Sequence, residues 1–368
     1  MNKTITALTI IMASFAANAS VLPETPVPFK SGTGAIDNDT VYIGLGSAGT
    51  AWYKLDTQAK NKSWTALAAF PGGPRDQATS AFIDGNLYVF GGIGKNSEGL
   101  TQVFNDVHKY NPKTNSWVKL MSHAPMGMAG HVTFVHNGKA YITGGVNQNI
   151  FNGYFEDLNE AGKDSTAIDK INAHYFDKKS EDYFFNKFLL SFDPSTQQWS
   201  YAGESPWYGT AGAAVVNKGD KTWLINGEAK PGLRTDAVFE LDFTGNNLKW
   251  NKLAPVSSPD GVAGGFAGMS NDSLIFAGGA GFKGSRENYQ NGKNYAHEGL
   301  KKSYSTDIHL WHNGKWDKSG ELSQGRAYGV SLPWNNSLLI IGGETAGGKA
   351  VTDSVLISVK DNKVTVQN

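Results

Sequence analysis

A glutamate and an arginine stand six residues apart near the middle of the chain, in the stretch 228–234, which reads EAKPGLR. Pro231 and Gly232 favour a turn, so we expect the chain to fold back and bring Glu228 and Arg234 over one cavity. A carboxylate partly shielded from water can serve as an acid or base near neutral pH. Arginine offers a rigid two-pronged donor to carboxylates. The pair is therefore a candidate catalytic site, and a surface salt bridge is the alternative.

Arginine is scarce in this sequence, and its placement is therefore informative. Only three of the 33 basic residues are arginines besides Arg234, namely Arg75, Arg286 and Arg326. On the repeat pattern described below, all of them map to one face of the molecule. A ring of such groups suggests an anionic ligand, and it makes these three arginines candidates for substrate binding.

The elements that must position these side chains are written as a repeat. A short apolar strand that ends in a glycine pair recurs along the chain, and a tryptophan follows most copies at a spacing of roughly 50 residues, with two insertions. Each unit therefore holds about four short strands. The copies are 41–46 with Trp64, 87–92 with Trp117, 140–145 with Trp199, 223–227 with Trp250, 274–279 with Trp316, and 338–343 without a following tryptophan.

This pattern resembles the kelch repeat, and the resemblance implies an all-β, six-bladed kelch-type β-propeller around an axial channel. We expect one domain over residues 20–368. Propellers are usually latched by strands from both chain ends, and residues 21–28 resemble an outer strand with its exit loop, so we expect an N-terminal contribution to the last blade. The alternative is that residues 356–359 and 364–366 complete the last blade alone. Kelch repeats often carry an arginine before the inner strand for structural reasons, which is the alternative for Arg75 and Arg326.

Both insertions follow a glycine pair, at about 146–186 in the third repeat and about 280–305 in the fifth. In the first insertion, apolar residues recur every three or four positions in 155–161 and 167–176, which indicates amphipathic helices. A lid over the channel mouth is the functional interpretation. A segment that packs on the rim or makes a dimer contact is the alternative.

The residue that follows each glycine pair should point toward the channel mouth. Two of these six positions hold glutamates, Glu228 and Glu344. In the repeat of Glu228, Asn226 also replaces the first glycine of the pair, which strengthens the case for that repeat. Glu344 is expected at the rim and is a weaker candidate for substrate binding. Aspartates recur at one repeat position before a strand and are interpreted as residues that staple loops: Asp106, Asp236, Asp307 and Asp353.

The first residues are typical of an exported protein. Lys3 precedes an apolar run from Ile5 to Ala17, and Ala17-Asn18-Ala19 matches the small-x-small site at which a secretory signal peptide is cleaved. The run is well short of the ~20 apolar residues that a membrane span needs. We therefore expect residues 1–19 to be a signal peptide.

Composition makes several functions improbable. The chain has no cysteine, which removes disulfides, zinc–thiolate sites and cysteine nucleophiles. Its 33 acidic residues balance 33 basic ones without a long run of either sign, so nucleic acid and anionic membranes are poor partners. The eight histidines form no HxH or HxxxH group, and no metal site is expected.

The exported kelch chain, the Asn226-Gly227-Glu228 departure and Arg234 together resemble the bacterial periplasmic N-acetylneuraminate epimerases, which are sialic acid mutarotases. The likeness runs the length of the chain and implies conversion between the α and β anomers of free sialic acid in the periplasm. It implies that Glu228 is the proton acceptor and that Arg234 is needed beside it. Ring opening removes one proton and delivers another, so no cofactor is expected.

Three questions stay open at the level of sequence. The acid that protonates the ring oxygen is not identified. The oligomeric state is not fixed, and a homodimer is compatible with the chain. Because kelch propellers are mostly interaction modules, the alternative function is a non-catalytic propeller that binds glycans or protein through the same face.

Overall fold

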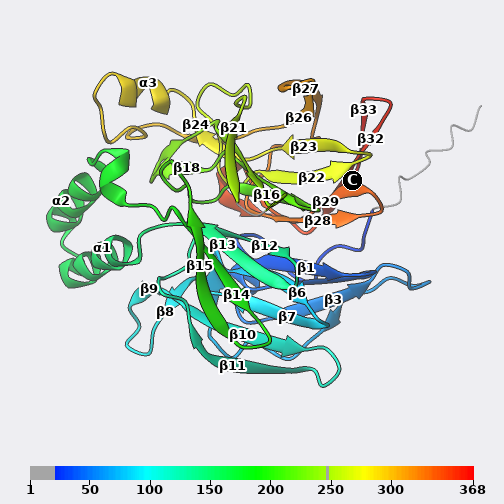
Figure 1. The fold of residues 1–368 in the computed structure, drawn as a ribbon. Helices are drawn as coiled ribbons and strands as arrows, with labels where there is room; N and C mark the ends of the chain where they lie inside the picture. Colours follow the sequence, from blue (N-terminus) through cyan, green and yellow to red (C-terminus); the bar gives the residue numbers. More distant parts are fainter. Residues whose placement is uncertain (1–20, 246–247) are drawn as a thin grey trace, which may run out of the picture.

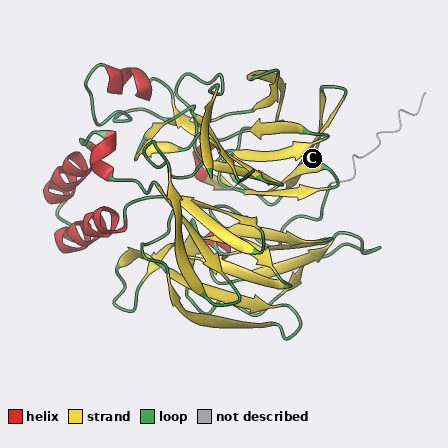
Figure 2. Cartoon of the chain, in the orientation of Figure 1, coloured by secondary structure: helices red, strands yellow, loops and turns green. Residues whose placement is uncertain are grey.

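The computed structural model describes residues 21–245 and 248–368, so the expected signal peptide at 1–19 lies outside the described residues. The described part is mostly antiparallel β-sheet, with a few helices gathered on one side (Figure 2). Among its helices, none has the length and apolar character needed to cross a membrane. The architecture is consistent with a β-propeller.

Within the described ranges, six antiparallel sheets have four strands each, and each sheet uses one continuous stretch of chain. The first contains β1 (Thr33–Asp37), β2 (Thr40–Gly44), β3 (Trp52–Asp56) and β4 (Thr65–Ala66). The second contains β6 (Thr79–Ile83), β7 (Asn86–Phe90), β10 (Asp106–Asn111) and β11 (Ser116–His123). The third contains β12 (His131–His136), β13 (Lys139–Gly144), β14 (Phe188–Asp193) and β15 (Gln198–Glu204).

The remaining three sheets follow the same order of strands, from the innermost to the outermost. The fourth contains β16 (Ala214–Lys218), β17 (Lys221–Ile225), β20 (Val238–Asp242) and β21 (Lys249–Leu253). The fifth contains β22 (Phe266–Ser270), β23 (Ser273–Ala277), β26 (Asp307–His312) and β27 (Lys315–Glu321). The sixth contains β28 (Val330–Trp334), β29 (Ser337–Ile341), β32 (Ser354–Lys360) and β33 (Lys363–Gln367).

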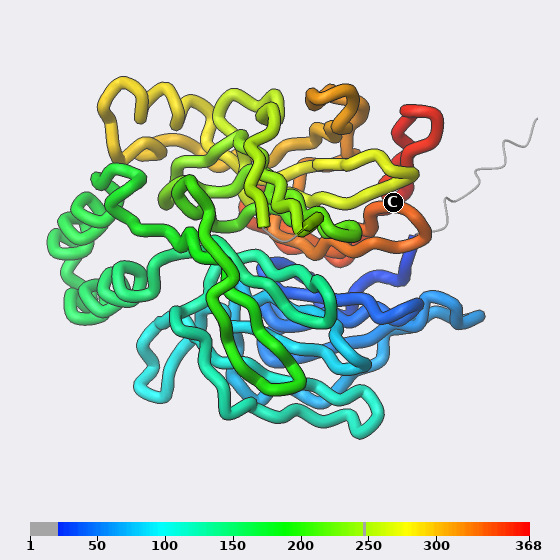
Figure 3. Tube along the Cα trace, in the orientation of Figure 1, coloured from blue at the N-terminus to red at the C-terminus, as the bar shows by residue number. Residues whose placement is uncertain are grey.

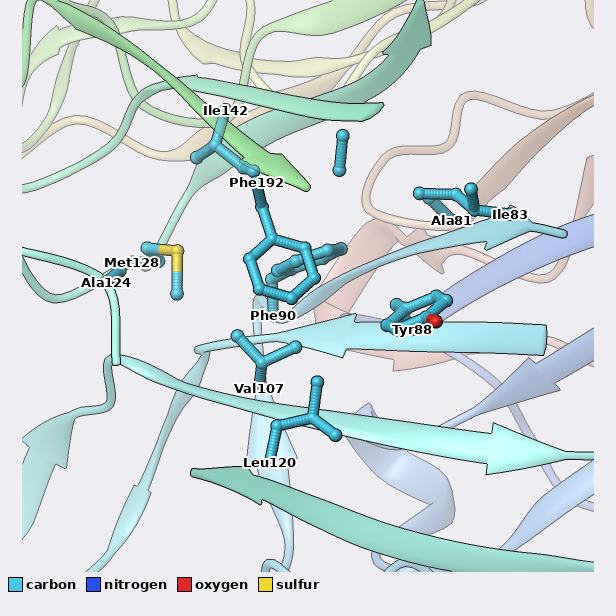
Figure 4. Close-up of a cluster of buried hydrophobic side chains, with 11 residues drawn as sticks. Ala81, Ile83, Tyr88, Phe90, Val107, Leu120, Ala124, Met128, Ile142 and Phe192 are labelled. Atoms are coloured by element: carbon cyan, nitrogen blue, oxygen red, sulfur yellow. The ribbon is translucent and has the colours of Figure 1, made fainter. Parts of the chain in front are cut away.

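The repeat seen in the sequence corresponds to these sheets. The apolar strand before each glycine pair is the second strand of its sheet, and most of the repeat tryptophans lie on the outermost strand. The second strands are apolar on both faces because neighbouring sheets cover them. Between the second and third sheets, for example, the rings of Phe90 and Phe192 pack 5.7 Å apart and contact Val107 and Ile142 (Figure 4). Burial of each such side chain contributes about 1.5–3 kcal/mol.

The innermost strands form a circle. Each of β1, β6, β12, β16, β22 and β28 lies next to the following one, and β28 lies next to β1. Just before each of these strands the chain passes through a residue with φ between 55° and 65°. Five of these residues donate a backbone N–H to the carbonyl of the preceding one at 2.7–2.9 Å, in the series Gln77 to Ser31, Ser31 to Tyr328, Tyr328 to Gly264, Gly264 to Gly212, and Gly212 to Gly130.

The prediction that the N-terminal segment adds a strand to the last sheet is wrong, because β33 from the C-terminus is the outermost strand of that sheet. The N-terminal segment instead lies across the joint between the first and last sheets (Figure 3), where the N–H of Thr25 donates to the carbonyl of Thr352 at 2.9 Å. Prolines at 23, 26 and 28 explain the difference, since proline has no N–H to donate to a strand ladder.

Both insertions contain helices. The first holds α1 (Gln148–Ala161), α2 (Ser165–Phe176) and the short η2 (Ser180–Tyr183), and the second holds α3 (Ser285–Gln290). The side chain of Asn147 caps α1 by accepting from Ile150 N–H, and Asp164 caps α2 in the same way. In Figure 1 all three α-helices lie on the same side of the molecule as β18 (Glu228–Lys230) and β24 (Ala280–Phe282).

Short strands and turns complete this side, because a small sheet follows the glycine pair in most repeats. They are β5 (Arg75–Asp76) with β8 (Ile93–Lys95) and β9 (Thr101–Val103), β18 with β19 (Leu233–Arg234), β24 with β25 (Lys302–Tyr304), and β30 (Glu344–Thr345) with β31 (Lys349–Ala350). Two short 3₁₀ turns are η1 (Gly46–Ala48) and η3 (Ala346–Gly348). The candidate chemistry therefore lies on these connections and not on the main sheets.

Candidate active site

Glu228 and Arg234 face each other across the β18–β19 hairpin, where they are paired residues on the two strands. The turn between them contains Gly232, whose φ is 80°. A methyl group on Gly232 would also overlap the imidazole of His297, so this position requires glycine. Asn226 replaces the first glycine of the repeat and keeps its left-handed backbone, with φ of 59°. The expected turn thus brings the two charged side chains together.

The guanidinium of Arg234 is enclosed by the protein, and the residue is only 5% exposed. Its Nη1 donates to Oε1 of Glu228 in an ion pair, and its Nε donates to the carbonyl of Ala280 at 3.3 Å. Nη2 makes a long hydrogen bond of 3.4 Å to the hydroxyl of Tyr328. The ring of Phe282 lies 5.1 Å from the guanidinium carbon. Burial lowers the pKa of Arg234, and the contact with Tyr328 opposes that shift.

Glu228 is anchored through one carboxylate oxygen. Oε1 accepts from Arg234 and, at 3.4 Å, from the N–H of Gly232. Oε2 has no protein hydrogen-bond donor among the residues that the structure describes, and the side chain keeps 24% of its surface exposed. The backbone of Glu228 pairs with that of Ala211, which fixes the strand. Oε2 is therefore the oxygen that can accept a proton from a bound molecule.

Glu344 has the same backbone position in the sixth repeat, where it pairs with Ala327. The expectation that it lies at the rim is wrong, because the residue is buried. Its carboxylate accepts from Lys30 Nζ at 2.6 Å, from Lys302 Nζ at 2.8 Å and from the hydroxyl of Tyr304. Burial would raise the pKa of Glu344, but these three donors outweigh it and hold the pKa at about 2.

The three remaining arginines each bind an aspartate. Arg75 holds Asp106, Arg326 holds Asp353, and Arg286 holds Asp236 through both terminal nitrogens at 3.0 Å. Arg75 and Arg326 also donate to the carbonyl of the first glycine of their repeats, Gly91 and Gly342.

These contacts favour a structural role for Arg75 and Arg326 over substrate binding, because their guanidinium groups donate to acceptors within their own repeats. The guanidinium of Arg286 is likewise occupied in this structure. Of the four arginines, only Arg234 is joined to a glutamate at the position that follows a glycine pair.

Lys230 is a residue that the sequence analysis did not single out. It is fully buried, and its Nζ donates to the carbonyls of Phe176, Lys178 and Asn294. Burial lowers the pKa of Lys230 to about 8. The ammonium thereby joins the end of α2 in the first insertion to the second insertion, directly beside the Glu228 hairpin.

Two further residues lie beside this site: Tyr328, which the sequence did not single out, and His297, which was expected alone on the same face and was given no role. Tyr328 has a φ of 57°, a conformation that costs a residue other than glycine about 1–2 kcal/mol. His297 packs its ring against Phe282 and Phe176 at centroid distances of 5.0 Å. Burial, with help from the charges of Arg234 and Lys230, lowers the pKa of His297 to about 4. His297 is therefore neutral at neutral pH.

A large open groove lies elsewhere. It has a volume of about 1200 Å³ beside the outer strands of the third sheet and is lined by aromatic residues that include Phe184, Trp199, Tyr201, Trp207 and Tyr208. Neither Glu228 nor Arg234 lines it. The Glu228–Arg234 pair and this groove are thus in different places.

These observations define a class of protein. The antiparallel sheets form a circle, and the connections between their strands carry a buried guanidinium beside a carboxylate that has one oxygen without a protein donor among the described residues. The class is a β-propeller-like scaffold whose loops are equipped for acid–base chemistry.

The comparison with known proteins narrows this class. The family model of N-acetylneuraminate epimerase matches residues 22–366, and the chain belongs to that family. It is 98% identical over 368 residues to the N-acetylneuraminate epimerase of Escherichia coli (strain K12), with all of both chains covered. It is 97% identical to that of Shigella flexneri serotype 5b (strain 8401), again over the full length of both. The solved structure of YjhT matches with a TM-score of 0.94 and 98% identity, covering 95% of this chain and 100% of that one.

Proposed function

We propose that this chain interconverts the α and β anomers of free N-acetylneuraminate. The observation that carries the proposal is the free Oε2 of Glu228 beside Arg234, in a chain 98% identical to a curated N-acetylneuraminate epimerase. We further propose that the six sheets are the blades of a single kelch-type propeller domain over residues 20–368, with a partly helical insertion in the third repeat.

The proposed mechanism uses Glu228 as the base. Its Oε2 removes the proton from the anomeric hydroxyl, the bond between the anomeric carbon and the ring oxygen breaks, and the ring oxygen takes up a proton. The open-chain ketone rotates and recloses on its other face, and Glu228 returns its proton to the former ketone oxygen, which becomes the new anomeric hydroxyl. Arg234 favours the ionised, proton-accepting form of Glu228 because it donates to Oε1.

Substrate binding also fits the charges at this site. Arg234 Nη2 is the least committed nitrogen of its guanidinium, because its one contact is the 3.4 Å bond to Tyr328. We assign this nitrogen to the carboxylate of sialic acid. We no longer propose Arg75, Arg286 and Arg326 as binding groups for the substrate carboxylate, because each of them is paired with an aspartate.

Several features rest on the sequence and on the contacts around the site. We propose that residues 1–19 are a signal peptide and that the mature chain works in the periplasm, as a monomer or homodimer and without a cofactor. The insertion at about 146–186 is proposed as a lid, because Lys230 ties the end of α2 to the Glu228 hairpin.

Proton NMR of α-sialic acid freshly released by a sialidase tests the proposal. With the protein present, the α signal should decay faster than the spontaneous rate, in proportion to protein concentration. Decay at the spontaneous rate would leave the non-catalytic alternative, a propeller that binds glycans or protein.

A further inference from the structure

We infer that Tyr328 is the acid that delivers a proton to the ring oxygen when the sugar opens and takes it back when the sugar recloses. The inference rests on the proposed function and supplies the second proton-transfer group that the mechanism requires. Three independent observations support it: the backbone position of Tyr328, the contacts of its hydroxyl, and the state of the neighbouring groups.

The backbone position of Tyr328 suits glycine better than tyrosine. Tyr328 belongs to the six left-handed residues that precede the innermost strands, and three of the other five are glycines, at 130, 212 and 264. Its ring lies over Gly264, where even a methyl group would overlap it. A bulky residue held in a strained backbone conformation is typical of functional sites. The side chain thereby lies over Gly264, and its hydroxyl reaches Arg234 of the Glu228 hairpin.

The hydroxyl of Tyr328 lies beside the same guanidinium as the base. Arg234 donates through Nη1 to Glu228 and through Nη2 to the Tyr328 oxygen, at 3.4 Å in the second case. Because a guanidinium can only donate, the phenol oxygen is the acceptor, and its own proton is left for another partner. A carboxylate that accepts protons and a phenol that donates them therefore stand on two sides of one cation.

Two cations lie close to Tyr328. Arg234 contacts its hydroxyl, and the ammonium of Lys302 lies 5.3 Å from the centre of its ring. The ammonium of Lys302 is paired with Glu344 at 2.8 Å, so the guanidinium of Arg234 is the cation in direct contact with the phenol.

The neighbouring acids are less suited to the step. The hydroxyl of Tyr304 donates to Glu344, and burial together with that carboxylate raises the pKa of Tyr304 well above its usual value. His297 is held neutral, and its ring is packed among aromatic side chains. Unlike the Tyr304 hydroxyl, the Tyr328 hydroxyl gives its proton to no protein acceptor among the described residues.

The step balances without a further reactant. Glu228 gains the proton of the anomeric hydroxyl, whose electrons form the ketone as the bond to the ring oxygen breaks. The ring oxygen takes the Tyr328 proton and becomes a hydroxyl, leaving a phenolate next to Arg234. On reclosure the phenolate removes that proton while the oxygen attacks the other face of the ketone, and Glu228 protonates the former ketone oxygen, which becomes the new anomeric hydroxyl.

The test compares Tyr328→Phe with wild type and with Tyr201→Phe, a control at an exposed tyrosine outside this site. In the NMR assay, Tyr328→Phe should lower kcat at least tenfold and leave KM within about twofold, a change typical of losing one acid–base group. Tyr201→Phe should match wild type. A Tyr328→Phe protein with wild-type kcat would overturn the inference. An inactive wild type would instead refute the proposed function itself.

A second measurement separates proton transfer from packing. Fluorotyrosine at position 328 keeps the shape of the side chain and makes its hydroxyl more acidic. The alkaline limb of the kcat profile should then move to lower pH by the difference in acidity between the two phenols. An unmoved profile would assign Tyr328 a structural role, even if Tyr328→Phe were inactive. Thermal unfolding should also show Tyr328→Gly to be more stable than Tyr328→Ala, because glycine relieves the left-handed strain.

Discussion

Glu228 and Glu344 have the same backbone position in two repeats, yet their surroundings differ in the feature that decides reactivity. Each follows the last glycine of its repeat, Gly227 or Gly343, and pairs with an alanine that leads into the innermost strand. Both oxygens of Glu344 are bound, by two ammonium groups and a hydroxyl, and its pKa is held at about 2. Glu228 has one cation on one oxygen, and the other oxygen is available.

In a repeat protein, carboxylates at equivalent backbone positions can therefore differ in reactivity, because the side chains around each one differ. A carboxylate saturated with donors is a weak base and a good structural anchor. A carboxylate with one free oxygen, held in place by the other, is suited to proton transfer. Four variants test this contrast between Glu228 and Glu344.

Glu228→Gln should have the largest effect. Glutamine keeps the shape and a hydrogen bond to Arg234 but cannot take up a proton, so the rate acceleration should fall by about 10²- to 10⁴-fold with little change in substrate affinity. The NMR anomer assay and a binding titration measure the two quantities. Near-wild-type turnover would move the base elsewhere, with Glu344 the next carboxylate to examine.

Arg234→Lys should come second. Lysine keeps the charge but cannot bind Glu228, Tyr328 and a substrate carboxylate at once, so binding and turnover together should lose about 1.5–3 kcal/mol. Arg286→Lys is a matched control, because the guanidinium of Arg286 binds the carboxylate of Asp236 and makes no contact with Glu228. Equal kinetic losses in both variants would mean that the Arg234 fork has no special role.

Lys230→Met should have a smaller, indirect effect. Methionine fills a similar volume but leaves the carbonyls of Phe176, Lys178 and Asn294 without their donor, at a cost of about 1–3 kcal/mol in stability. Hydrogen exchange should speed up at residues near 176–180 and 294, and turnover should fall less than for Arg234→Lys. Unchanged exchange in both segments would show that the ammonium does not hold the insertions together.

Glu344→Gln should change turnover least and should affect stability instead. The pKa of the folded carboxyl, about 2, lies below its ordinary value of 4.5. The stabilisation from its charge is therefore complete above pH 4.5 and is lost as the pH falls toward about 2. Urea unfolding should show the variant less stable than wild type by about 1.5–3 kcal/mol at pH 7. If the difference in free energy of unfolding between wild type and variant stayed constant down to pH 3, the charge of the Glu344 carboxylate would not be the cause of that difference.

The sequence predicted the repeated second strands and the hairpin of Glu228 and Arg234 because both depend on local chemistry, namely apolar runs, glycine pairs and the Pro231-Gly232 turn. Pairings between distant residues were less accessible. The aspartates that bind Arg75 and Arg326 recur visibly in the sequence, but 31 and 27 residues separate the partners, and only the sheet between them makes them neighbours.

The burial of Glu344 depends on Lys30, which lies 314 residues away in the chain, and no local pattern reports such a contact. Tyr328 was overlooked for a related reason. Its position is occupied by glycine in three other repeats, so a tyrosine there carries a signal only once the repeats are aligned at that residue and its left-handed backbone is known.

Each sheet in the described part uses its own continuous stretch of chain, and this has a consequence for how the circle is held closed. The first and last sheets do not exchange a strand. Their joint is made by the N-terminal segment, through Thr25 and Phe29, by the backbone bond from Ser31 to Tyr328, and by apolar side chains that the two sheets bury against each other. The first and last sheets could therefore separate without either of them losing a strand. Tyr328, the proposed acid, lies at that seam, so parting the seam would displace the proposed acid and also expose the apolar side chains that the first and last sheets bury against each other.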